Sequence, residues 1–382
     1  MELWNLPVPW YSLKLSSLTT LSLHCVHGRF RQNTKEFLTT LSCMQDLRHI
    51  DLDDALASAA AFLSSAAFDA FQKINLPHLS CLSIFAPLLT VITLLSCIKF
   101  PLETEVRIKC HHMGDSSFSG YVRLSSLLAR IFHMVDEQAS SILTIHSIIM
   151  QFTGEAATLI FSASELDLGP SIFIPSAWWG CGIPLQITIL PALSRTMTTN
   201  DRDRILTSIC CSMPLTVVQS LHVIGPPASS AFWRTILDHL QGLRHLTLRD
   251  GRMPDLSSVL SSIPPSHAED QGEYRVPACV PAPALEVLQL SRISFFSPLD
   301  SKNDMLRYSG VQSLHDALSS RKDSRGHLVM TECSMCTTDH SFGFDMVGEW
   351  ENGHFRVVSA TPRPGPAKTA DTDRPNEGRR AM

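Results

Sequence analysis

The chain has 382 residues, of which 44% are hydrophobic and only 18% are charged, and it is longer than a single compact core usually grows. A formal net charge of −5 argues against general nucleic-acid binding, which needs a basic face. The eleven cysteines form no regular framework, and their odd number fits a reducing compartment better than a disulfide scaffold. We therefore expect a soluble cytoplasmic or nuclear protein, built as two domains or as an elongated array.

The N-terminal segment MELWNLPVPWYSLKL contains two prolines and no basic region, so it does not predict a signal peptide. The longest apolar run, FAPLLTVITLLSCIKF, is interrupted by Pro87, by Lys99 and by three hydroxyl residues between them. Such a run is too interrupted to predict a membrane span. We expect neither a membrane nor a nucleic acid as a partner.

One phrase of apolar residues recurs along the chain. When its last apolar residue is numbered zero, the others lie at −8, −5 and −2, as in LQGLRHLTL (residues 240–248). Leucines three apart carry the chain out of a helix, and the final alternation predicts a short strand with alternate residues in the core. The zero positions are Leu23, Leu52, Ile84, Ile108, Val223, Leu248 and Leu290; in the copy that ends at Ile108, Glu103 stands at an apolar position.

Segments between these phrases have helical spacing. NTKEFLTTLSCM (33–44) offers Asn33 or Thr34 as an N-cap, and SSAFWRTILDHLQG (229–242) begins with serines after two prolines. MPDLSSVLSSI and VQSLHDALSS have similar spacing. The predicted unit is helix, turn, strand and turn, and such units must stack to bury their apolar faces.

Other parts of the chain lack the phrase. In residues 110–205 the offsets fail, although SILTIHSII, ATLIFSA and LQITIL are strand-like, which predicts degenerate repeats. Residues 262–284 are rich in proline and predict an exposed loop insertion. Residues 336–358 predict a C-terminal capping hairpin with Asn352-Gly353 at its turn, and residues 359–382 predict a disordered tail.

The phrase resembles the leucine-rich repeat L-x-x-L-x-x-L-x-L, here written LPHLSCLSI and LQGLRHLTL. With its long, irregular units, the region from about residue 12 to 335 resembles the leucine-rich-repeat part of fungal, basidiomycete-type F-box proteins. Those proteins are the substrate receptors of Skp1–cullin–F-box ubiquitin ligases. The resemblance implies an α/β solenoid, residues 1–335, in which short parallel strands form a curved sheet with helices on the convex side. It also implies a protein ligand on the concave strand face.

Two features depart from that family. The segment before Leu15 is too short for an F-box, so Skp1 and cullin are expected partners only if an F-box lies upstream. The Asn or Cys that usually follows each strand is also absent, so the turns must be stabilised in another way. The residues at that place, +3, are Val26, Ala55, Pro87, Pro226, Gly251 and Ile293.

Candidate metal ligands are sparse. Cys333-x2-Cys336 with His340 and His327 would make a zinc site, but without a second CxxC the simpler interpretation is the end of a last repeat. His111-His112 with Asp115 is more simply a polar turn after a strand. No G-x-S-x-G, P-loop, G-x-G-x-x-G or H-E-x-x-H motif is present. We expect no catalytic residue, no cofactor and no metal.

The outward positions −3, −1 and +1 of each phrase are the candidate partner-binding residues. Their mixed charge suits protein recognition, although an ordinary solvated sheet face would have the same pattern. The main hypothesis is a non-catalytic protein-binding module; the alternatives are an incomplete or remnant scaffold and, third, a zinc-binding protein or enzyme. The candidates are His49, Asp51, Asp53, Arg107, Lys109, His222, His245, Thr247, Arg249 and Gln289.

Overall fold

The computed structural model shows a mixed α/β protein with one large sheet and few helices. It describes residues 2–4, 17–24, 33–57, 73–111, 118–133, 145–153, 156–163, 185–190, 197–225, 229–250, 260, 282–293, 295, 309–319, 321, 325–336, 341–351 and 354–363.

The strands are β1 Glu2–Trp4, β2 Thr20–His24, β3 His49–Asp53, β4 Ile74–Asn75, β5 Cys81–Pro87, β6 Ile98–Lys99, β7 Glu105–His111, β8 Ser147–Thr153, β9 Ala156–Ser162, β10 Leu185–Leu190, β11 Ser220–Ile224, β12 His245–Arg249, β13 Val287–Ser291, β14 Arg325–Cys336, β15 Ser341–Glu351 and β16 His354–Arg363. The helices are α1 Thr34–Leu41, α3 Leu88–Cys97, α4 Phe118–His133, α5 Thr199–Ser212, α6 Ser230–His239 and α8 Ser309–Ser319.

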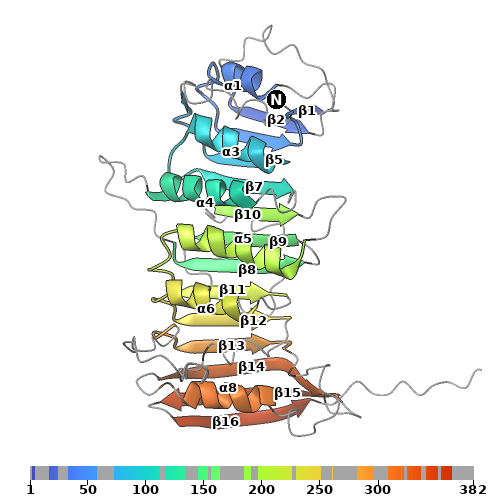
Figure 1. Ribbon diagram of the computed structural model, residues 1–382, viewed down its shortest axis with the longest axis vertical. Coiled ribbons are helices and arrows are strands. Elements are labelled where there is room, and N and C mark those ends of the chain that lie inside the picture. Colours follow the sequence, from blue (N-terminus) through green and yellow to red (C-terminus); the bar gives the residue numbers. More distant parts are fainter. Residues whose placement is uncertain are drawn as a thin grey trace, which may run out of the picture.

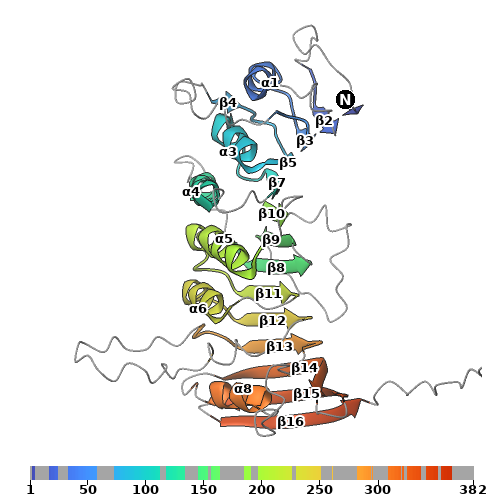
Figure 2. The same ribbon diagram turned by 45° about the vertical axis from the view of Figure 1, so that its right-hand side comes forward.

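Fourteen of the described strands form one sheet, in the order β1-β2-β3-β5-β7-β10-β9-β8-β11-β12-β13-β14-β15-β16, and β4 pairs separately with β6. The strands follow one another along the long axis of the molecule (Figure 1). The helices all lie on one side of the sheet (Figure 2), where α3, α4, α5 and α6 pack successively against one another. We call the opposite side the open face.

The recurring phrase forms the strands and the core beneath the helices. Leu21, Ile50, Leu82 and Val106 are aligned across four parallel strands without a register slip, and all four are at most 1% exposed. The phrases near the C-terminus align in the same way on β11, β12 and β13. The predicted alternation of core and outward residues is confirmed on β2, β3, β5, β7 and β12, but not on β11, where four of the five residues are buried.

The joint between helix and strand is also confirmed. Helix α6 ends at His239, Leu240 is its C-cap, and β12 begins at His245. The side chain of Asn33 accepts the amide of Lys35 at 2.9 Å and caps α1. These local features follow from residue type, because an Asn, Ser or Thr oxygen satisfies an amide that the first helical turn leaves free.

A recurring backbone turn takes the place of the missing Asn ladder. The residue at +2 has a positive φ in several units, for example Asp54 (48°) and Asp250 (58°). Its amide donates to the carbonyl of the +1 residue on the next strand: Asp54 to Phe85 at 2.8 Å and Asp250 to Ser291 at 3.1 Å. Each turn is thus stabilised by its neighbour in the stack rather than by a buried side chain.

The expectation of an all-parallel sheet is wrong at four strand pairs, which are β8 with β9, β9 with β10, β14 with β15, and β15 with β16. Only residues 154–155 join β8 to β9, and only 352–353 join β15 to β16. Such short links permit a hairpin, whereas a parallel pair needs a crossover of roughly a dozen residues or more.

The middle of the chain reverses the strand order. After β7 and α4, the chain passes to β8 and then returns through β9 to β10, which pairs in parallel with β7. Residues 110–205 therefore supply regular strands to the same sheet, although only β8 and β10 run in the common direction.

At the C-terminal end, β14, β15 and β16 form an antiparallel unit (Figure 1). Residues 359–363, which we expected in the tail, belong to β16. Most of the proline-rich insertion and residues 364–382 lie outside the described residues. No helix among the described ranges has the length and apolar character needed to cross a membrane.

Candidate functional site

The open face carries rows of side chains from successive strands. In one row, at −1, Asp51 is aligned with Ser83 and Ser83 with Arg107. In the row at +1, Asp53 is aligned with Phe85 and Phe85 with Lys109. Strands are spaced by about 4.8 Å, so residues far apart in sequence become direct neighbours. The sequence predicted these positions as outward-facing, and all five charged or aromatic side chains named here are partly or fully exposed.

We define the N-terminal patch as the predicted residues on β3 and β7 together with the neighbours that they contact. His24 lies between two carboxylates, with Nε2 at 3.8 Å from Asp51 and Nδ1 at 3.7 Å from Asp53. Lys109 Nζ lies 4.6 Å from the ring centroid of Phe85. The patch comprises His24, His49, Asp51, Asp53, Phe85, Glu105, Arg107, Lys109 and His111.

Charges inside this patch are largely balanced by one another. Arg107 contacts Glu105 on its own strand, with Nη2 at 2.6 Å from Oε1 and Nε donating to the same oxygen at 2.8 Å. The Phe85 ring lies 5.0 Å from the ring of His111. A partner would therefore meet a preorganised, mixed surface rather than a field of one sign, which favours specific protein contacts over phosphate binding.

We define the C-terminal patch as His245, Thr247 and Arg249 on β12 with Gln289 on β13. All four side chains are partly exposed, and Thr247 is aligned directly with Gln289. Arg249 is held in place, since its Nε lies 3.5 Å from Asp250, which also accepts from Arg292 at 2.6 Å. The turn residues Asp250 and Arg292 thus extend this patch.

His222 differs from the other predicted residues. It occupies the same −1 position as Thr247 and is aligned with it, but it is only 5% exposed. Ile149 and Ile160, which continue the row on β8 and β9, are also buried. The expectation that His222 faces solvent is wrong, and the middle of the open face is not free surface. The two patches are therefore separate.

Four members of these patches, His24, Phe85, Asp250 and Arg292, are not among the predicted binding residues. Phe85 and His24 were at outward positions in the same phrases and could have been found by completing each row. Asp250 and Arg292 lie at +2, which is not one of the outward positions −3, −1 and +1. Their role depends on the left-handed turn, with φ of 58° and 52°, which the apolar spacing does not reveal.

The zinc and catalytic hypotheses gain no support from the described residues. Within these ranges, no group of three or more His, Cys, Asp or Glu side chains is placed to hold a metal ion. Cys333 is buried, burial raises the pKa of its thiol to about 11, and its Sγ lies 3.5 Å from the carbonyl of Leu290. His327 lies on an outward position of β14, and His112, Asp115 and His340 are outside the described residues.

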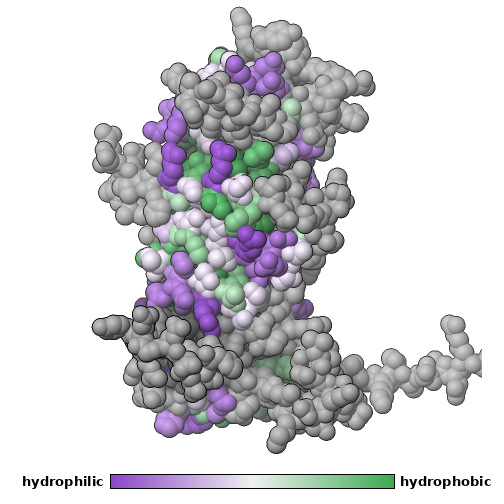
Figure 3. Space-filling model, in the orientation of Figure 1, coloured by the Kyte–Doolittle hydropathy of each residue, from purple (hydrophilic) through white to green (hydrophobic). Residues whose placement is uncertain are grey.

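The helix-covered face is a second large surface. Figure 3 views this face and shows apolar side chains grouped near α3 and α4, with polar groups on either side. Leu89 on α3 is 36% exposed and Val122 on α4 is 42% exposed. Single apolar residues at this level are common on soluble proteins, so this face serves as the comparison surface in the experiments below.

Comparison with protein-family models, with curated proteins and with solved structures finds no match to this chain.

Proposed function

We propose that this chain is a non-catalytic module that binds a protein partner on the open face of its sheet. The observation that carries the proposal is the slip-free register, which assembles residues from distant units into two mixed polar patches on one face. Strands β2 and β13, the outermost strands of the two patches, are nine steps apart, so together the patches extend over roughly 43 Å at about 4.8 Å per strand. Two separate patches at this distance suit a polypeptide that contacts both better than a small ligand.

We propose further that the units form a leucine-rich-repeat-like solenoid resembling the substrate-recognition part of a fungal F-box ubiquitin-ligase receptor. The aligned phrases and the recurring turn at Asp54, Asp250 and Arg292 support this interpretation. The antiparallel strand β9 is a departure from it. Skp1 and cullin would be partners only through an F-box upstream, and the compartment would be the cytoplasm or the nucleus.

The test is quantitative affinity purification of the full chain from its native cells. One variant changes both patches, Lys109→Glu with Thr247→Glu. The control, Arg234→Glu with Ser230→Glu, makes the same change in charge on exposed positions of α6. We expect a partner that the wild type and the control retain equally and that the patch variant loses by at least about tenfold, the effect of about 1.4 kcal/mol.

Other outcomes would point elsewhere. Equal retention by all three chains would contradict binding on the open face. If only the α6 control lost the partner, the binding site would lie on the helix-covered face instead. A wild-type chain that retains no protein above the level of the patch variant would favour the alternative of an incomplete or remnant scaffold. Stoichiometric zinc in the purified chain would favour the metal hypothesis. Co-purification of Skp1 and cullin tests the ligase role separately.

A further inference from the structure

The N-terminal patch is polarised across three consecutive strands of the sheet, β3, β5 and β7 (Figure 2). Strand β3 presents two carboxylates, Asp51 and Asp53, on the open face, whereas β5 has no charged residue. On β7, Arg107 is paired with Glu105 of the same strand, and Lys109 makes no ion pair within the described part of the chain. The patch therefore has a negative pole on β3 and a positive pole on β7.

Asp51 is the more accessible carboxylate of the negative pole. Its side chain is 44% exposed, and it lies 3.8 Å from Nε2 of His24. The same imidazole also faces Asp53, which lies 3.7 Å from Nδ1. Even a protonated His24 carries one charge and cannot by itself balance both carboxylates. A cationic group of a partner can therefore reach Asp51 from solvent and pair with it.

The two poles do not neutralise each other. Strands β3 and β7 are two steps apart in the sheet, which is roughly 9.6 Å at about 4.8 Å per strand. The Debye length at physiological ionic strength is about 8 Å, so exposed charges at this separation are largely screened from each other. Each pole therefore remains available to a charged group of a partner that comes into contact with it.

An aromatic side chain lies between the poles. Phe85 is aligned with Asp53 on β3 and with Lys109 on β7, and it is partly exposed. Lys109 Nζ lies 4.6 Å from the ring centroid of Phe85, and the ring of His111 lies 5.0 Å away, so its neighbours hold the ring in place. Aromatic residues are enriched in the core of protein interfaces. From β3 to β7 the patch thus presents an anion, an aromatic ring and a cation, one on each strand.

The spacing of these three groups fits a helix better than an extended chain. Along the long axis of the sheet, the second and third groups lie about 4.8 and 9.6 Å from the first. On one face of an α-helix, residues i+3 or i+4 lie about 4.5–6 Å from residue i, and residue i+7 lies about 10.5 Å from it. On one face of an extended chain, residues i+2 and i+4 lie about 6.8 and 13.6 Å away. The mismatch at the third group is therefore about 1 Å for a helix and about 4 Å for an extended chain.

We propose that the N-terminal patch binds an amphipathic helix of the protein partner, which lies across the strands along the long axis of the sheet. A lysine or arginine of this helix pairs with Asp51, and an apolar residue three or four positions along packs on Phe85. An aspartate or glutamate seven positions from the cation pairs with Lys109. Opposite charges at the two ends of the contact fix the direction of the helix. This inference deepens the proposed function and rests on it.

The test reverses one pole at a time in the full chain and measures, by quantitative mass spectrometry, how much of the partner each variant retains from native cells. Asp51→Lys reverses the negative pole, and Lys109→Glu reverses the positive pole. The matched controls are Asp46→Lys and Lys35→Glu, which make the same changes at exposed residues outside the patch. We expect each pole variant to retain at least tenfold less of the same partner than its control, and unfolding curves check that all four variants are folded.

A photo-cross-linker identifies the partner segment itself. p-Benzoylphenylalanine at position 85 keeps an aromatic side chain between the poles and reacts with the group that packs on it. We expect the cross-linked segment to have Lys or Arg three or four residues to one side and Asp or Glu three or four residues to the other. The corresponding ¹³C-labelled synthetic segment should have helical chemical shifts when it is bound to the full chain. A segment that binds in an extended form, or that has charges of one sign, overturns the inference.

Two patterns in the pole variants overturn the inference but leave the proposed function standing. A partner whose contact has one charge sign is lost by one pole variant and retained more strongly by the other. A partner that uses only the C-terminal patch is retained by both pole variants as by their controls, and is lost by Thr247→Glu. By contrast, a wild-type chain that retains no partner overturns the proposed function and this inference together.

Discussion

The backbone amide of Glu332 donates to Oδ1 of Asp345 at 2.7 Å. Glu332 has a φ of 53° and stands at the +2 position of its strand, like Asp250 and Arg292 in earlier units. In those units the amide donates to a carbonyl of the next parallel strand. Strand β15 runs antiparallel to β14, and a carboxylate takes the place of that carbonyl. Asp345 thus completes the last turn of the stack.

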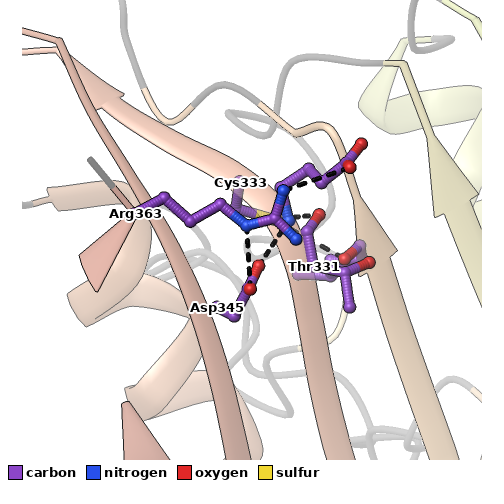
Figure 4. Close-up of polar contacts among 6 residues, drawn as sticks. Thr331, Cys333, Asp345 and Arg363 are labelled. Carbon is purple, nitrogen blue, oxygen red and sulfur yellow. Dashed lines mark hydrogen bonds and ion pairs between the residues drawn. The ribbon is translucent and has the colours of Figure 1, made fainter. Parts of the chain in front are cut away.

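Replacing Asp345 tests this capping role. Arg363 orients the carboxylate by donating to Oδ2 at 2.8 Å, and it also contacts Glu332 at 3.1 Å (Figure 4). We expect Asp345→Ala to lower the free energy of unfolding by about 1 kcal/mol, the net value of one hydrogen bond. Hydrogen exchange at the Glu332 amide should accelerate. Exchange at the Leu246 amide in β12 should accelerate only as much as the lower free energy of global unfolding requires. Unchanged exchange at Glu332 would contradict the cap.

The same contact predicts a dependence on pH. The Glu332 amide, and then Arg363, hold the pKa of Asp345 below its usual value of 3.8. The charged form is favoured in the folded chain, so its contribution is fully present above pH 3.8 and is lost as pH falls through the lower folded pKa. Asp345→Asn keeps an acceptor but removes the charge. We expect the wild type to lose more stability than Asp345→Asn between pH 5 and pH 3; parallel curves would contradict this.

The helix caps and the helix-to-strand turns of this fold can be predicted from the sequence, but the pairing of distant strands cannot. The caps at Asn33 and Ser229 and the joint at Leu240 depend on residues a few positions apart, and all three follow from the sequence. The position of β8 beside β11 depends on which distant strands pair, and apolar spacing does not encode this. The hairpin of β8 and β9 does have a local signal, because only Gly154 and Glu155 separate two strand-like segments and such a short link predicts a hairpin.

The candidate site shows the same limit. Asp51, His222 and Thr247 share the −1 position, and spacing alone assigns all three to solvent. His222 is buried because burial on a sheet face depends on the neighbouring segments, whereas the offset fixes only the side of the sheet.

Gly326 is expected to tolerate no side chain. An added Cβ would collide with the backbone carbonyl of Glu286 and with the ring of Trp350. We expect Gly326→Ala to destabilise the chain by about 1–3 kcal/mol through overpacking, measured by denaturant unfolding. Gly343→Ala on β15 is the control, because its nearest neighbour would be Arg363 Cβ at 3.3 Å. Equal losses in the two variants would mean that the indole does not pack closely on Gly326.

Asp54 tests the recurring turn. Its φ of 48° is left-handed, a conformation that costs an ordinary L-residue roughly 1–2 kcal/mol and is worst for β-branched side chains. We expect Asp54→Val to be about 1–2 kcal/mol less stable than Asp54→Gly. Asp53→Val, at the last residue of β3, should lose much less, since valine suits a strand. If the Asp54→Val and Asp54→Gly variants were equally stable, the left-handed turn at position 54 would be contradicted.

Leu246 and Thr247 separate the core from the binding surface within two adjacent residues. Leu246 is 0% exposed and aligned with Leu221 and Leu288, so Leu246→Ala should cost about 2–5 kcal/mol through lost burial and a cavity. Thr247→Ala, on the open face, should stay within about 0.5 kcal/mol of the wild type. At a temperature where both variants are folded, Thr247→Ala should weaken partner binding more than Leu246→Ala does, because only Thr247 belongs to the C-terminal patch. A Thr247 variant that unfolds as readily as the Leu246 variant would place this row in the core and remove the physical basis for binding there.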